Sequence, residues 1–154
     1  MAKRKKTDLI ILHCAATKPS MDIDISTIDE WHRKRGFWSC GYHFVITRSG
    51  KLQTGRQLHD IGANAKGYNH RSIGICLVGG VTQEDHTVAE NNFTEQQWVT
   101  LDKLLIKLLH TFPSVKIIGH NQVSDKDCPS FDVQTYLKDK PFSESGSKDP
   151  SHIA

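Results

Sequence analysis

The segment Thr7-Asp8-Leu9-Ile10-Ile11-Leu12-His13-Cys14 decides how this chain folds. Its run of four aliphatic residues, Leu9 to Leu12, is typical of a strand that is buried on both faces of a sheet. His13 comes at the end of the run, before a turn of small and polar residues. Because open α/β sheets carry their functional groups at the carboxyl ends of their strands, His13 is the first candidate functional residue.

Strands and helices are interspersed along the rest of the chain, and this order predicts an α/β fold with a mixed central β-sheet flanked by helices. Ser49-Gly50 is expected to form a two-residue hairpin turn. Capping boxes are expected to begin helices at Ser26 and at Thr94, and residues 57–72 to form a long loop over the strand ends. Strands are predicted at 7–14, 41–48, 51–54, 73–78 and 115–118, and helices at 27–35, 95–111 and 129–138.

Length and composition indicate a single domain. A chain of 154 residues with 37% hydrophobic and 24% charged residues can bury about two-thirds of its unfolded surface around one core. We predict a basic N-terminal arm at residues 1–7, a folded domain at 8–140 and a flexible tail at 141–154. The net charge of +3 comes from the run Lys3 to Lys6, which we interpret as a solvated arm. Direct nucleic-acid binding is therefore not expected.

No apolar segment reaches the length of a membrane span, and no secretion signal precedes the first strand. We therefore expect a protein that is made in the cytoplasm and does not bind membranes. The four cysteines have no disulfide spacing and are interpreted as reduced. For three of them a buried, inert role is expected, whereas Cys128 has polar neighbours.

The segment from Gly119 to Phe131 predicts a metal site. His120 follows the last predicted strand, and seven residues separate it from Cys128. If the strands that end at His13 and His120 are parallel neighbours, these residues and Cys128 form a His/His/Cys set with one open position, which is typical of catalytic zinc. Nine histidines make chance placements common. The alternatives are a core histidine at position 13 and an inert thiol at Cys128.

Two further residues could complete a hydrolytic site. Zinc lowers the pKa of a water ligand to about 7 and polarises a substrate carbonyl. Lys126 could stabilise the resulting oxyanion, and Tyr42 or Lys126 could protonate a leaving amine. Tyr42 and His43 are adjacent in a predicted strand, so only one of them can point into the site. The alternatives are a packed aromatic at Tyr42 and a solvated lysine at Lys126.

Several segments resemble the T7-type phage lysozymes, which are zinc N-acetylmuramoyl-L-alanine amidases, and their wider family, which includes the peptidoglycan recognition proteins. The resemblance runs from about Leu9 to Leu137. Its segments are His13-Cys14-Ala15-Ala16-Thr17-Lys18-Pro19-Ser20, Gly41-Tyr42-His43-Phe44, Ala65-Lys66-Gly67-Tyr68-Asn69-His70, Ser72-Ile73-Gly74-Ile75-Cys76-Leu77-Val78-Gly79-Gly80 and Cys128-Pro129-Ser130-Phe131.

The resemblance implies a site as well as a mixed sheet flanked by helices. One zinc ion per chain would be held by His13, His120 and Cys128, with Tyr42 and Lys126 as the catalytic pair. Related amidases commonly have a histidine where this chain has Asn64. Residues of this loop are expected to line the substrate groove, and the candidates for substrate binding are Asn64, Ala65 and Asn69.

The implied function is that of a phage endolysin that hydrolyses the amide between N-acetylmuramic acid and L-alanine in peptidoglycan. We expect a monomer that stays in the host cytoplasm and then reaches the periplasmic cell wall with the help of a holin. An alternative is a regulatory protein that inhibits a phage-type single-subunit RNA polymerase, with or without amidase activity and with Lys3 to Lys6 as the contact. A zinc hydrolase of another amide or ester is a third possibility, because fold does not determine function.

Overall fold

Strand β1 (Leu9–Cys14), which contains the aliphatic run, lies in the interior of the sheet. In the computed structural model, which describes residues 2–142, β1 is hydrogen-bonded to β4 (Ser72–Leu77) on one side and to β5 (Lys116–Gly119) on the other. Both neighbours run parallel to it, and all six of its residues are buried. A strand buried on both faces is the expected outcome of a continuous apolar run.

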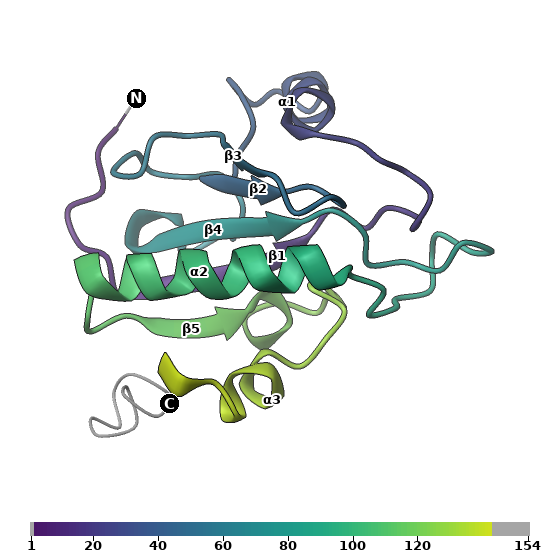
Figure 1. The fold of residues 1–154 in the computed structure, drawn as a ribbon. Helices are drawn as coiled ribbons and strands as arrows, with labels where there is room; N and C mark the ends of the chain where they lie inside the picture. The colour runs from purple at the N-terminus through teal and green to yellow at the C-terminus, as the bar shows by residue number, and fades with distance from the viewer. Residues whose placement is uncertain (1, 143–154) are drawn as a thin grey trace.

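The remaining strands form a hairpin at one side of the sheet. Strand β2 (Phe44–Ile46) runs parallel to β4 and antiparallel to β3 (Leu52–Thr54), which gives the order β3-β2-β4-β1-β5 (Figure 1). The predicted α/β fold with a mixed sheet is therefore confirmed. Among residues 2–142, no helix is both long and apolar enough to cross a membrane.

The hairpin turn differs from the prediction by one residue. The N–H of Thr47 donates to the carbonyl of Lys51 at 3.0 Å, so three residues rather than two form the loop. Gly50 has a φ of 86°, in the left-handed region that glycine adopts without strain. A residue in the left-handed region directly after a turn is typical of a three-residue hairpin loop.

Helices cover both faces of the sheet. Helix α2 (Glu95–Thr111) lies across one face, and α3 (Val133–Lys138) lies beside β5 (Figure 1). Both pack with the even-numbered side chains of β1 in one apolar cluster. On the other face, Ile28 of α1 (Ile25–Lys34) packs with residues of β2 and β4, while Ala65 packs with Leu9 and Ile11.

Local capping decides where the helices begin. Thr94 and Gln97 form the predicted capping box of α2, and Phe93 packs edge-to-face on Trp98 with ring centroids 5.7 Å apart. The capping box predicted at Ser26 is wrong, because the Asp24 side chain accepts from the Ser26 N–H and begins α1 earlier.

The predicted start of the last helix at residue 129 is also wrong. Ser130 has a φ of 72°, which is not helical, and Asp132 caps α3 by accepting from the N–H groups of Gln134 and Thr135. Two short 3-10 turns complete the elements, η1 (Asn69–Arg71) and η2 (His120–Gln122).

The interpretation of residues 3–6 as a solvated arm is wrong for Arg4, whose side chain is buried and donates to the carbonyl of Asp60 at 2.9 Å. Lys3, Lys5 and Lys6 are exposed as expected, although Lys3 forms an ion pair with Asp60. The N-terminal segment is therefore attached to the loop that follows β3. Most of the predicted tail, residues 143–154, lies outside the described residues.

Candidate metal centre

The pairing of β1 with β5 brings two histidines together. Leu12 is aligned with Gly119, so the residues that follow them, His13 and His120, lie side by side at the carboxyl ends of parallel strands. Their ring centroids are 4.5 Å apart, and both side chains are buried. The expectation that these two strand ends meet is confirmed.

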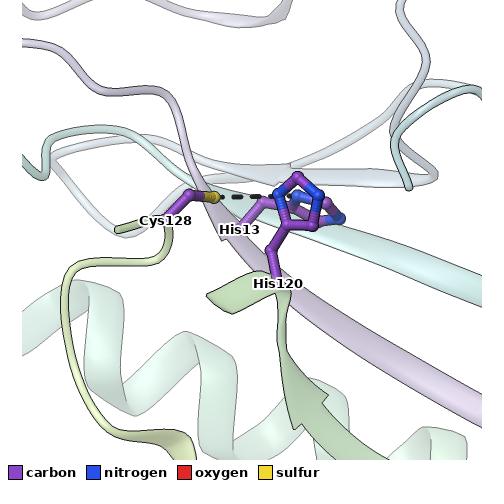
Figure 2. Close-up of side chains that lie close together, drawn as sticks. All are labelled: His13, His120 and Cys128. Carbon is purple, nitrogen blue, oxygen red and sulfur yellow. Dashed lines mark hydrogen bonds between the residues drawn. The ribbon is translucent and has the colours of Figure 1, made fainter. Parts of the chain in front are cut away.

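Cys128 completes the cluster from the loop between η2 and α3. Its Sγ lies 3.7 Å from Nδ1 of His13, and one donor atom from each of His13, His120 and Cys128 lies within 4.8 Å of the others (Figure 2). The backbone N–H of Cys14 donates to the same sulfur at 3.2 Å, which orients it and would stabilise a thiolate.

This donor set fits zinc. Two imidazole nitrogens and one thiolate are ligands that zinc prefers, and Zn–N and Zn–S bonds are about 2.1 and 2.3 Å long. Donor atoms this close together can be bridged by one ion after small side-chain adjustments. Three protein ligands leave the fourth tetrahedral position open, which is the arrangement of catalytic rather than structural zinc.

The surroundings keep both histidines neutral at pH 7. Burial, followed by the charges of His120 and Lys126, lowers the pKa of His13 to about 3. Burial and the charge of Lys126 also lower the pKa of His120. The pKa of the Cys128 thiol is raised by its hydrogen bond with Cys14 and by burial, so metal binding would release a proton from this sulfur.

Tyr42 and His43 point in different directions, as their adjacency in an extended segment predicted. The Tyr42 ring lies 5.1 Å from the His13 ring, at the metal centre. Burial raises the pKa of the Tyr42 hydroxyl well above its usual value, so this hydroxyl is protonated at neutral pH. His43 is fully buried and is held by the N–H of Gly74 and the carbonyl of Asp60.

Lys126 lies in the exposed loop that leads to Cys128. Its positive charge lowers the pKa of both His13 and His120, so the ammonium acts electrostatically on the metal centre. Within residues 2–142 its side chain forms no ion pair. The structure thus brings all five predicted zinc and catalytic residues to one end of the sheet.

His32 belongs to the same region, although it was not among the predicted site residues. Its Nδ1 accepts from the N–H of Gly41 at 2.7 Å, and its ring packs on Tyr42 with centroids 5.3 Å apart. His32 therefore supports the segment that carries Tyr42. Its position four residues after Ile28, on the buried face of α1, was the available signal.

The three predicted substrate-binding residues have internal contacts. Ala65 is only 2% exposed and packs in the core. The Asn69 side chain accepts from the N–H groups of Asn64 and Ala65, both at 2.9 Å. Asn64 contacts Gly41 and His13. Substrate contact by Asn64, Ala65 and Asn69 remains a prediction.

Comparison with known proteins identifies the family. Residues 3–131 match the family described as N-acetylmuramoyl-L-alanine amidase. This chain belongs to that family. One relative of this amidase is the endolysin of Enterobacteria phage K11, which is 42% identical over 136 residues that cover 88% of this chain and 89% of the relative. Another is the endolysin of Escherichia phage T7, which is 42% identical over 134 residues that cover 87% of each chain.

Solved structures agree with this result. The N-acetylmuramoyl-L-alanine amidase LysC from Clostridium intestinale has a TM-score of 0.71 and 27% identity, over 93% of this amidase and 85% of LysC. Drosophila PGRP-LB has a TM-score of 0.73 at 24% identity, over 91% and 85% of the two chains, and supports the fold. The predicted amidase function is confirmed. The comparisons do not support the alternative of a regulator of RNA polymerase.

Proposed function

We propose that this amidase binds one zinc ion per chain through His13, His120 and Cys128 and uses it to hydrolyse the bond between N-acetylmuramic acid and L-alanine in peptidoglycan. The observation that carries the proposal is the convergence of three zinc-type donor atoms within 4.8 Å at the ends of adjacent parallel strands. When bound, zinc supplies Lewis acidity that activates water and polarises the carbonyl of the scissile amide.

The side chains around the donors carry the remaining steps. The Lys126 ammonium stabilises the negative charge that develops on the carbonyl oxygen, since its field already reaches both histidines. The Tyr42 hydroxyl, protonated at neutral pH and beside the His13 ring, positions water or passes a proton to the departing amine. Both proposed roles require Lys126 and Tyr42 to contact the substrate rather than to bind zinc.

A cell-wall assay tests the reaction. Purified peptidoglycan should lose turbidity when the enzyme is added, and each cleavage should release a new L-alanine amino group without a new reducing sugar. A chelator should abolish the activity and added zinc should restore it. Reducing ends would instead indicate a glycosidase, and activity that persists in chelator would contradict the role of zinc.

Ligand variants test the metal site separately from catalysis. His13→Ala, His120→Ala and Cys128→Ala should each bind much less zinc, measured by elemental analysis after dialysis. His86→Ala is the matched control, because His86 lies in the exposed 80–92 loop and should leave the zinc content unchanged. Stoichiometric zinc in any one of the three ligand variants would contradict the assignment of that ligand.

The biological setting follows from the relatives, which are named as phage endolysins. We propose that the protein works as a monomer and reaches the wall of its host through a membrane opened by a holin. Sedimentation equilibrium of the purified protein tests the first statement. Lysis on co-expression with a holin, without lysis when the amidase is expressed alone, tests the second.

A further inference from the structure

The carboxamide of Asn64 contacts His13 of the metal centre at Nε2, whereas Cys128 faces the other ring nitrogen, Nδ1. Its Nδ2 donates to the carbonyl oxygen of Gly41 at 2.9 Å. Its Oδ1 lies 3.0 Å from Nε2 of His13. Both polar groups of this side chain are therefore engaged within the protein.

These two contacts determine which nitrogen of His13 carries hydrogen. A carbonyl oxygen only accepts, so the atom of Asn64 that faces Gly41 must be the NH₂ group, and the atom that faces His13 must be the oxygen. Nε2 of His13 must then be the protonated nitrogen. Nδ1 keeps its lone pair and is the atom that lies 3.7 Å from Sγ of Cys128, on the side of the metal site.

Two glycines make room for this carboxamide. A Cβ added at Gly74 of β4 would lie 2.4 Å from Nδ2 of Asn64, and a Cβ at Gly62 would lie 2.6 Å from the same atom. The backbone of the loop is held as well, because Asn69 accepts from the N–H groups of Asn64 and Ala65. The Asn64 carboxamide is thus closely packed, and a side chain at Gly62 or Gly74 would displace it.

We infer that Asn64 is a positioning residue, which holds His13 in the Nε2–H tautomer with Nδ1 toward the metal and connects this ligand to the backbone just before Tyr42. The inference rests on the proposed zinc function. A hydrogen-bond partner behind a metal-ligating histidine orients the ring, and loss of such a partner typically costs about 10- to 100-fold in metal affinity.

The first test is made on metal-free protein at pH 7.5. Long-range ¹H–¹⁵N spectra of the histidine rings should show the Nε2–H tautomer for His13 in the wild type and a mixture of tautomers in Asn64→Ala. An Nδ1–H tautomer in the wild type, or an unchanged tautomer in Asn64→Ala, would overturn the inference. This measurement is independent of zinc, so it decides the inference even if the wild type binds no zinc and the proposed function fails.

The second test measures zinc affinity by competition with a chromogenic chelator. Asn64→Ala should bind zinc about 10- to 100-fold more weakly than the wild type. Asn64→Asp keeps an oxygen toward Nε2 but replaces the donor to the Gly41 carbonyl with a second oxygen, so its affinity should lie between those of the wild type and Asn64→Ala. A loss as large as in Asn64→Ala would overturn the inference. Asn121→Ala is the matched control, since it removes a carboxamide next to His120 that donates to the carbonyl of Phe131 at 3.4 Å rather than to a metal ligand, and its affinity should match the wild type.

Discussion

Tyr42 and Lys126 differ in how firmly the protein holds them. The Tyr42 ring is packed between the rings of His13 and His32. Lys126 extends from an exposed loop and acts on the site through its charge. The proposed proton donor is therefore held by aromatic packing, whereas the proposed cation is exposed to solvent.

Tyr42→Phe and Lys126→Met should lower amidase activity without removing zinc. Loss of an oxyanion-stabilising group costs about 10²- to 10³-fold in kcat, and loss of a general acid about 10²- to 10⁴-fold. The measurements are turnover on purified peptidoglycan and zinc content by elemental analysis. Full activity in either variant would show that its assigned role is wrong, and loss of zinc would show that the residue supports the metal instead.

His43 should make the fold sensitive to acid. Burial lowers the pKa of His43 to about 4, and the charge of Arg4 acts in the same direction, whereas an unfolded histidine titrates near 6.5. Because the folded pKa is the lower one, this contribution to stability is complete above about pH 6.5 and is lost as pH falls toward 4. The difference corresponds to about 3 kcal/mol.

The histidine Cε1–H resonances, followed by NMR as a function of pH, measure this directly. His43 should titrate near pH 4, or the protein should unfold before it does. Urea unfolding at several pH values should show stability rising between pH 4 and 6.5. A His43 resonance that titrates near pH 6.5 in folded protein would contradict the prediction.

At the scale of elements, a side-chain cap determines where helix α2 begins, and the ends of parallel strands place the histidines. The capping box at Thr94 starts α2, the long helix that covers one face of the sheet. The Thr94 hydroxyl also donates to the carbonyl of Arg48, in the loop of the β2–β3 hairpin. The parallel pairing of β1 with β5 places the two histidines. The start of α2 and the placement of the two histidines thus depend on different residues.

Thr94→Ala should destabilise the protein by about 1 to 2 kcal/mol, the upper part of the range for a helix cap, because it removes both hydrogen bonds of the hydroxyl. Urea unfolding followed by circular dichroism measures the change. Thr111→Ala, at the exposed end of the same helix, should cost less than about 0.5 kcal/mol. Equal losses in the two variants would contradict the importance of the cap.

Across the whole molecule, the proposed metal joins β1, the end of β5 and the loop before α3. The proposed proton donor, Tyr42, comes from a fourth segment, just before β2. These segments are far apart in the chain and meet only in the folded state, so a ligand that binds all three donors must stabilise that state.

Zinc removal should therefore lower the melting temperature. A ligand present at about 1,000 times its Kd stabilises the native state by about 4 kcal/mol. Calorimetry of the wild type with excess zinc and with chelator measures the shift, and Cys128→Ala should show a much smaller one. An identical melting temperature with zinc and with chelator would contradict metal binding to the native state.

Local patterns were sufficient for most of the elements. The run Leu9 to Leu12 predicted β1, and Thr94 with Gln97 predicted α2, because these signals depend on residues a few positions apart in the chain. The ends of β1 and β5 also followed from their apolar runs, so the meeting of His13 with His120 could be expected. The errors at Ser26 and Ser49-Gly50 were of one or two residues, where neighbouring caps and turns compete.

The sequence by itself thus determined the order of the elements, the mixed sheet and the five residues proposed for zinc and catalysis. Only the tertiary structure decided that Arg4 is buried against Asp60 and that Asn64 contacts His13. The physical reason is separation along the chain. His13 and Asn64 are 51 residues apart, and no local pattern encodes which side chain fills the space that Gly74 leaves open.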